Sequence, residues 1–350
     1  MLHIKNGWIQ LSRSWVITCI GFVVAVGLPF IVNNPSTPPQ QPVLPVIPPQ
    51  HLVNLPTAIA ADHGQVPKAS GPPVYLGTQP TGVVPGQFVT EHFVDAGGAR
   101  MTYYLYVPRQ YDPTQRYPLV LLLHGADESA NLSRSAERNR ANLLNQNYVR
   151  EFVAASVQDK WPSFVVVPQI SGTTARWVNV PGGATSYHLS SKPSSSLQRA
   201  IDIVATLQHT YTAVDGNRLY ITGISMGGYG VWDAVERWPG MFAAAVPISG
   251  AGDPHNAGLL TTLPIWDFHG GHDTLVPASS SRKMHSAIAA LGGMACYTEV
   301  PGYSHDLWNT IKVYANATFL SWLFAQTQVE TQGKHPPSCK GLVVHGVPAK

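Results

Sequence analysis

The sequence predicts an α/β fold, with a mostly parallel, doubly wound sheet that begins with antiparallel strands. Two observations predict it. Short runs that are apolar at nearly every residue, such as Tyr117–Leu123, alternate with segments whose apolar residues recur at spacings of three and four. The runs are typical of strands buried on both faces of a parallel sheet, and the segments are typical of amphipathic helices. Their alternation implies right-handed crossovers, with helices on both sides of the sheet.

The antiparallel start is predicted from residues 87–107. Two strands are expected at 87–94 and 101–107, separated by the turn sequence Asp95-Ala96-Gly97-Gly98. The second alternates apolar and polar residues, as a half-buried antiparallel strand does. The further expected strands are 117–123, 164–168, 219–222, 243–248, 264–268 and 297–300. The expected helices are 147–156, 195–210, 228–237, 279–291 and 307–326.

Length and composition fit one large domain with extensions, or two small domains. The chain has 350 residues, of which 44% are hydrophobic, so it can bury a substantial core. Charged residues make up 12% of the chain, about half of their usual share. The formal net charge is +3, and lysine and arginine form no cluster. We therefore expect no binding to nucleic acid.

The chain before the first expected strand reads as an export segment followed by a linker. Residues 15–32 form an apolar run behind Lys5 and Arg13, which is typical of an export signal and long enough to span a bilayer as a helix. Residues 1–32 are therefore a cleaved signal peptide or a retained anchor, and both interpretations stay open. Residues 33–86 are rich in proline and predict a semi-rigid spacer.

The N-terminal charges also predict on which side of the membrane the folded part lies. Basic residues in front of an apolar segment favour a cytoplasmic N-terminus, with the rest of the chain outside. We expect an extracytoplasmic protein that is membrane-anchored through this segment if it stays uncleaved, or otherwise secreted or periplasmic. The domain expected to carry the function is 87–328, and residues 329–350 form a C-terminal tail.

The strongest local signal surrounds Ser225. The expected strand 219–222 runs into Gly223-Ile224-Ser225-Met226-Gly227, and a helical pattern follows. A nucleophilic serine requires such a sharp strand-to-helix turn, which exposes its hydroxyl at the carboxyl end of the sheet, and small residues at 223 and 227 let the turn form. Ser225 is therefore the candidate nucleophile. The alternative is a turn rich in glycine and serine that carries no chemistry.

A serine hydroxyl needs a base, and that base needs a carboxylate to orient it. In this architecture the chain order is serine, acid, histidine, and Asp273 and His305 supply that order. Asp273 follows the expected strand 264–268, and His305 follows 297–300. Three loops would thus bring Ser225, Asp273 and His305 to one edge of the sheet.

Rival acids fit less well. Asp253 comes too early in the chain, Asp267 lies within a strand, and Asp306 would face a different way from its neighbour His305. We expect surface or capping roles for these three.

The segment His269-Gly270-Gly271-His272-Asp273 could also be read as a metal cluster. Its spacing suits no helical pair, and no second histidine-rich segment accompanies it. Because no Cys-x-x-Cys pair occurs either, a zinc site is not expected, and neither a metal nor an organic cofactor is needed.

An acyl-transfer site also needs donors for the oxyanion. The backbone N–H groups of Met226, directly after the nucleophile, and of Ala126, after the third strand, are the candidates. Asp127 and Glu128 are expected to support that loop. Trp177, on the long loop after the fourth strand, would either line a substrate pocket or simply pack in the core.

Together these motifs resemble the predicted-peptidase or esterase group of α/β-hydrolases, which is similar to polyhydroxybutyrate depolymerases, feruloyl esterases and dienelactone-hydrolase-like proteins. The resemblance covers roughly residues 85–328. It implies the α/β-hydrolase fold, a triad of Ser225, Asp273 and His305, and oxyanion donors at Ala126 and Met226. The group usually has glycine where Asp127 stands here. The segments that carry the resemblance are 121–125, 176–177, 221–230, 242–250, 264–277 and 297–308.

The expected function is hydrolysis of carboxylic esters, small or polymeric, through an acyl-enzyme. The 47 residues 226–272 are nearly consumed by two helices and two strands, so we expect no large lid and an open site. The alternatives are a serine peptidase of the same fold and a surface-tethered binding protein without catalysis. Nothing in the sequence indicates an oligomeric state.

The cysteines leave one question open. Cys19 lies in the N-terminal apolar run, whereas Cys296 and Cys339 lie late in the chain. In an oxidising compartment the last two could form a disulfide. The alternative is a pair of free thiols.

Overall fold

The computed structural model describes residues 84–172, 174–179, 187–328, 338–344 and 346–350. All of them belong to the second of two compact units, Ala58–Lys350, and the first, Met1–Thr57, lies outside the described residues. The expected signal or anchor and nearly all of the expected linker therefore also lie outside them. Within the described ranges, no helix combines the length and the apolar character needed to cross a membrane.

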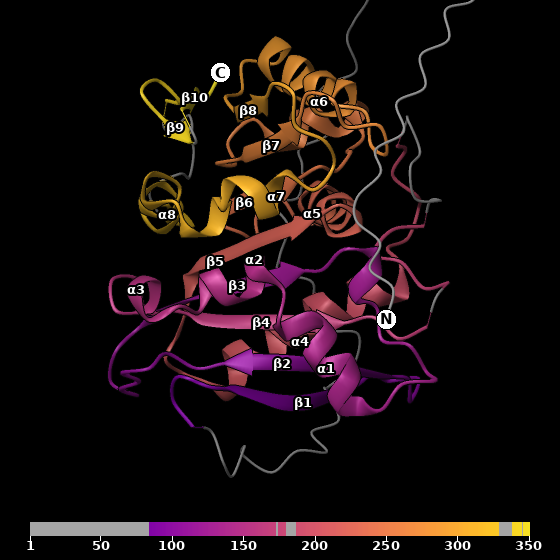
Figure 1. The fold of residues 1–350 in the computed structure, drawn as a ribbon, viewed down its shortest axis with the longest axis vertical. Coiled ribbons are helices and arrows are strands. Elements are labelled where there is room, and N and C mark those ends of the chain that lie inside the picture. Colours follow the sequence, from indigo (N-terminus) through magenta and orange to yellow (C-terminus); the bar gives the residue numbers. More distant parts are fainter. Residues whose placement is uncertain (1–83, 173, 180–186, 329–337, 345) are drawn as a thin grey trace, which may run out of the picture. The chain divides into compact units, whose positions relative to one another are not determined.

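One mixed sheet organises the described residues (Figure 1). Its strands lie in the order β1-β2-β4-β3-β5-β6-β7-β8. The pairs β1–β2 and β2–β4 are antiparallel and all other neighbours are parallel. This is the α/β-hydrolase fold, so the predicted fold class is confirmed. The strands are β1 (Phe88–Val94), β2 (Arg100–Tyr106), β3 (Tyr117–Leu123), β4 (Phe164–Gln169), β5 (Val214–Ile224), β6 (Ala244–Ile248), β7 (Trp266–Gly270) and β8 (Cys296–Val300).

Helices bury both faces of the sheet. Leu119, Leu121 and Leu123 of β3 belong to one hydrophobic core, whereas Val120 and Leu122 belong to the other. Successive side chains of a strand point to opposite faces, which is why the central runs are apolar throughout. One face is covered by α4 (Ser195–Thr210), α5 (Met226–Arg237) and α6 (Ser279–Ala290). The other is covered by α1 (Ala136–Leu144), α2 (Asn147–Phe152), α3 (Ala155–Gln158), α7 (Leu307–Ile311) and α8 (Ala317–Phe324).

Two stretches differ from the helices expected. The predicted helix 307–326 is broken at Lys312, which adopts a left-handed conformation with φ 48° and ψ 54°. A 3-10 turn follows, and Asn316 then caps α8 by accepting a hydrogen bond from the N–H of Phe319 at 3.1 Å. The predicted helix 147–156 is likewise divided into α2 and α3.

Helix α1 was not predicted from the sequence. Its buried residues are Leu143 and Leu144, at its end, so they give no apolar periodicity for a pattern to detect.

No lid domain lies between Ser225 and Asp273, a stretch that the structure describes in full. It holds α5, β6, the 3-10 helix η2 (Pro254–Leu260) and β7. The second of the two helices expected there is thus a short 3-10 segment.

The described part of the C-terminal tail, residues 338–344 and 346–350, contacts the edge strand β8. Cys296 of β8 and Cys339 of the tail form a disulfide, which answers the question that the sequence left open. Tyr297 and Lys350 exchange two backbone hydrogen bonds, at 2.9 and 3.2 Å. Between these attachments lies a hairpin of β9 (Val343–Val344) and β10 (Val347–Pro348), drawn in yellow in Figure 1. The two bonds to Lys350 occupy the outward-facing backbone groups of Tyr297, which are then not free to pair with another chain.

Candidate active site

Ser225 lies between β5 and α5 in a strained backbone conformation. Its φ is 53° and its ψ is −117°, a combination that a residue with a Cβ rarely adopts and that costs roughly 1–3 kcal/mol. The surroundings hold it there: the N–H of Ser225 donates to the carbonyl of Ile248 in β6 at 2.9 Å, and its own carbonyl accepts from Tyr229 at 3.1 Å. The hydroxyl is thereby fixed at the carboxyl end of the central strand.

Two glycines let the strand and the helix meet at this turn. A Cβ on Gly227 would lie 2.0 Å from the carbonyl oxygen of Leu123, and a Cβ on Gly223 would lie 2.6 Å from the carbonyl oxygen of Gly227. Both clashes are with backbone, which cannot yield without separating β3, β5 and α5. The requirement for small residues at 223 and 227, inferred from the sequence, therefore has a direct steric cause.

The three residues that the sequence places on separate loops meet at this edge. His305 Nε2 lies 2.7 Å from Ser225 Oγ, and His305 Nδ1 lies 2.7 Å from Asp273 Oδ2. A carboxylate can only accept, so Nδ1 carries the proton and Nε2 is free to accept from the serine hydroxyl. The arrangement can move a proton from Ser225 to His305 and stabilise the cation that results.

The Asp273 carboxylate is buried and well provided with donors. Its Oδ1 accepts from the N–H groups of Leu275 at 2.9 Å and Val276 at 2.8 Å. Burial acts to raise its pKa, but hydrogen bonds from His269, His305 and Val276 outweigh burial and hold the pKa well below its ordinary value. Asp273 is therefore ionised at neutral pH.

His269, the first residue of the segment that could be read as a metal cluster, is a fully buried support for Asp273. Its Nε2 lies 2.8 Å from the carbonyl oxygen of Val276 and 3.3 Å from Asp273 Oδ2, and its Nδ1 lies 2.7 Å from Ser281 Oγ. His272, in contrast, is exposed. The two histidines of the His-Gly-Gly-His-Asp segment thus face different surroundings. Sequence reasoning missed the supporting role, although the position of His269 at the end of β7, just before Asp273, was the available signal.

The three rival acids contact residues other than Ser225, His305 and Asp273. Asp253 caps η2 by accepting from the N–H of His255 at 3.1 Å, as expected, although its side chain is buried. Asp306 accepts from Ser304 Oγ at 3.0 Å. For Asp267 the expected surface or capping role is wrong, because it is fully buried within β7. His285 Nε2 lies 3.5 Å from Asp267 Oδ2.

Ala126 and Met226 occupy equivalent positions at two helix starts. Ala126 is the first residue of η1 (Ala126–Glu128), and Met226 is the first residue of α5. The first N–H groups of a helix have no acceptor within it, so both can donate to an oxygen of a bound ligand. Strands β3 and β5 are parallel neighbours, with Leu123 paired to Gly223, which brings the turns that follow the two strands together.

Buried contacts fix the loop that contains Ala126. His124 Nδ1 donates to the carbonyl of Gly125 at 2.6 Å, and its Nε2 accepts from the N–H of Ile170 at 3.0 Å. The indole N–H of Trp177 donates to the carbonyl of His124 at 2.9 Å. Trp177 is 0% exposed, so its position matches the packing role rather than a place on a pocket wall.

Glu128 lies beneath the same loop. A Cβ on Gly125 would be 3.0 Å from Glu128 Oε2. Burial, together with the charge of Asp127, raises the pKa of Glu128 to about 7. The side chain therefore packs against the loop partly protonated at neutral pH, in keeping with a supporting role.

The buried His124 is expected to make the protein sensitive to mild acid. Burial lowers its pKa to about 4, against the effect of its bond to Gly125. In the unfolded chain the pKa returns to about 6.5, so below that pH the unfolded state binds more protons and stability falls as the pH falls. Between pH 7 and pH 4 this one group should remove about 3 kcal/mol from the free energy of unfolding.

The measurement is urea unfolding of the wild type and of His124→Asn at a series of pH values. The variant should be less stable at pH 7, because it loses the contact with Ile170, and the difference should shrink toward pH 4. A constant difference across this range would contradict the assignment.

Comparisons with known proteins show similarity to esterases. The Esterase family model matches residues 95–330, which confirms the resemblance drawn from the motifs. A bifunctional acetylxylan esterase/xylanase of Neocallimastix patriciarum is 26% identical over 179 residues, 51% of this chain and 22% of that protein. A solved structure described as a thermostable esterase has a TM-score of 0.60 and 33% identity, covering 69% of this chain and 63% of that one. The chain thus spans about a fifth of the curated relative's length.

Proposed function

Since the chain belongs to the Esterase family, we propose that it hydrolyses carboxylic esters through an acyl-enzyme formed on Ser225. Membership of the family supports ester hydrolysis. The observation that carries the mechanism is the pair of 2.7 Å contacts by which His305 joins Ser225 to Asp273. The strained turn at Ser225 and the ionised state of Asp273 support the same assignment.

Acylation begins when Ser225 Oγ attacks the ester carbonyl carbon and its proton passes to His305 Nε2. Asp273 holds the imidazole in the required tautomer and stabilises its cationic form. The N–H groups of Ala126 and Met226 bind the negative oxygen of the tetrahedral intermediate. When the intermediate collapses, the alcohol leaves with the proton from His305, and the acyl group stays on Ser225.

Deacylation repeats these steps with water. His305 Nε2 takes a proton from water as the water oxygen attacks the acyl carbon. The second intermediate collapses, the proton returns to Ser225 Oγ, and the carboxylic acid is released. The groups named supply every proton transfer.

One observation supports a substrate class within the esters. Between Ser225 and Asp273, a stretch that the structure describes in full, the chain carries no inserted lid, which favours bulky or polymeric esters as well as small ones. We propose such esters as substrates.

We also propose an extracytoplasmic location for the protein. It is supported by the apolar run at 15–32 behind basic residues and by the Cys296–Cys339 disulfide, a bond that persists in oxidising compartments. Fractionation of expressing cells separates an anchored form, found with membranes, from a secreted one.

The proposed function is tested with the full chain on two substrate panels and a covalent probe. Nitrophenyl esters of increasing acyl length and peptide nitroanilides are compared by kcat/KM, and a fluorophosphonate reports a reactive serine. We expect ester turnover to exceed amide turnover, and the label to map to Ser225. Amide turnover without ester turnover would indicate a peptidase, and absence of both turnover and label would indicate a binding protein.

A further inference from the structure

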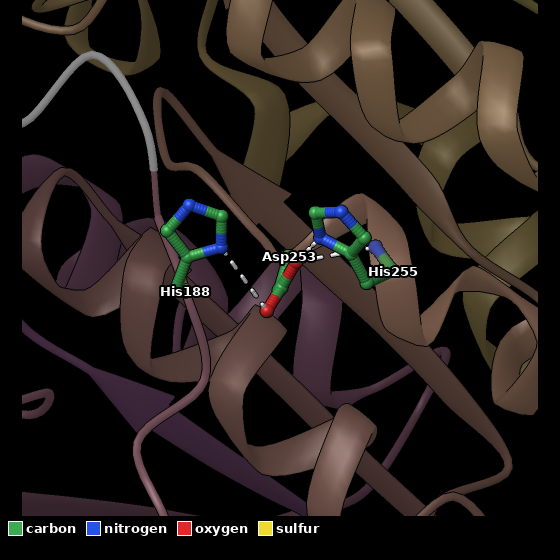
Figure 2. A group of neighbouring side chains, drawn as sticks. All are labelled: His188, Asp253 and His255. Carbon is green, nitrogen blue, oxygen red and sulfur yellow. Dashed lines mark hydrogen bonds and ion pairs between the residues drawn. The ribbon is translucent and has the colours of Figure 1, made fainter.

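Three potential metal ligands gather outside the Ser225, His305 and Asp273 set. His188 Nδ1 lies 3.7 Å from Asp253 Oδ2, and His255 Nδ1 lies 2.8 Å from Asp253 Oδ1. One ligand atom from each of the three residues lies within 4.8 Å of the others. Figure 2 shows the two imidazole rings flanking the carboxylate. No sequence motif predicts this group, because His188 belongs to a different loop from Asp253 and His255.

The spacing of these atoms fits a small tetrahedral ion. Zinc bonds to imidazole nitrogen and carboxylate oxygen at about 2.0–2.1 Å, which sets neighbouring ligand atoms roughly 3.3 Å apart. His255 Nδ1 lies 2.8 Å from Asp253 Oδ1 and His188 Nδ1 lies 3.7 Å from Asp253 Oδ2. One ligand atom from each of the three residues lies within 4.8 Å of the others, which is close enough for side-chain rotation to place them around one ion. Two imidazoles and one carboxylate leave a fourth position for water.

The carboxylate at the centre is held in place by its own surroundings. The Asp253 side chain is 8% exposed; its Oδ2 accepts from the N–H of Leu189 at 2.9 Å, and the backbone N–H of Asp253 donates to Glu236 Oε1 at 2.8 Å. These contacts hold the carboxylate between the two imidazoles.

The two imidazoles are accessible from solvent. The side chains of His188 and His255 are 69% and 78% exposed, so an ion can reach them without any rearrangement of the core. His255 now donates from Nδ1 to Asp253. To bind an ion through Nδ1 it exchanges that proton with solvent for one on Nε2, which leaves the ring neutral and the Nδ1 lone pair free.

We propose that His188, Asp253 and His255 bind a divalent transition-metal ion of the zinc type. Two imidazoles favour such ions over calcium and magnesium, which take oxygen ligands. The ion links the segment at His188 to the loop after β6. Because β6 lies between β5 and β7 in the sheet, this link is at the same sheet edge as Ser225. It stabilises the rim of the site and takes part in no step of ester hydrolysis.

The test measures zinc binding by the full chain after treatment with a chelator. Titration calorimetry with zinc chloride should show one ion per chain. Loss of an outer-sphere partner alone weakens a metal site roughly 10–100-fold, so His188→Gln and His255→Gln should each raise Kd by at least about tenfold. The double variant should lose this binding.

Two matched controls separate this site from other histidines. His92 is exposed on β1, where its Nδ1 contacts Thr102 Oγ1 at 3.2 Å, and His92→Gln should keep the wild-type Kd. His305→Gln should keep it too, which excludes an ion bound at the catalytic histidine. Ester turnover without zinc serves as the check that His188→Gln and His255→Gln are folded, since neither residue belongs to the catalytic set.

A second readout is thermal stability. An ion that binds only the folded state raises Tm, so zinc should raise the Tm of the wild type and of His92→Gln but leave the double variant unchanged. The proposal is overturned if the wild type binds no stoichiometric zinc. It is equally overturned if the double variant binds as the wild type does, or if His305→Gln rather than the double variant abolishes binding.

Discussion

Ser225→Ala is expected to lower kcat for ester hydrolysis by a factor on the order of 10⁵–10⁶. The alanine has no oxygen to attack the carbonyl, so no acyl-enzyme forms, and the oxyanion donors alone account for the residual rate. The fold should persist, because alanine occupies less space than serine and the turn is held by backbone bonds to Ile248 and Tyr229. Steady-state kinetics with nitrophenyl acetate and fluorophosphonate labelling measure the effect.

Ser304→Ala is the matched control for this loss. Ser304 precedes His305 in the chain, and its hydroxyl donates to Asp306 at 3.0 Å. The variant therefore lacks a hydroxyl beside the site but keeps the proposed nucleophile. We expect its kcat to stay within a few-fold of the wild type. If Ser225→Ala kept about a tenth of the wild-type kcat, Ser225 could not be the nucleophile.

Asp273→Asn is expected to lower kcat by roughly 10⁴. An asparagine amide cannot stabilise the imidazolium, and its NH₂ group can donate to His305 Nδ1. That places the imidazole proton on Nε2, where it no longer accepts from Ser225. Because the pKa of Asp273 is held well below its ordinary value, the wild type should keep this carboxylate ionised throughout the acid limb of its pH–rate profile.

The control for Asp273→Asn is Asp306→Asn, a change at the acid that follows His305 in the chain. Asp306→Asn removes a charge next to His305 in the chain, but Asp306 contacts Ser304 rather than the imidazole. Its kcat and its pH–rate profile should stay close to those of the wild type. If Asp306→Asn lowered kcat as much as Asp273→Asn does, the assignment of Asp273 as the orienting acid would be wrong.

Much of the fold could be read from the chain because the central strands are buried on both faces. Runs such as Tyr117–Leu123 have to be apolar throughout, and that pattern is visible without any contact information. The break at Lys312 could not be read, since a lysine in a left-handed conformation leaves no mark in the sequence. Helix α1 was hidden for a related reason, because it buries too little to show a period.

The candidate site likewise has residues that the sequence predicts and residues that only tertiary contacts reveal. Ser225, Asp273 and His305 each follow a strand, so the order of strands was enough to group them. The support that His124 and Trp177 give to the oxyanion loop depends on a contact between residues 53 positions apart. Likewise, His188 joins Asp253 and His255 only through tertiary structure. Such contacts leave no local pattern for a sequence motif to capture.

The tail bound to β8 has a consequence for recombinant production of the protein. In a reducing cytosol Cys296 and Cys339 stay as thiols, so the segment that covers β8 is held by backbone hydrogen bonds and packing without its covalent anchor. When that segment detaches, in a newly synthesised or heated chain, the edge strand β8 is exposed and can pair with strands of other chains, which leads to aggregation. Export of the chain to the bacterial periplasm, where disulfides form, is therefore the route by which soluble material should be obtained.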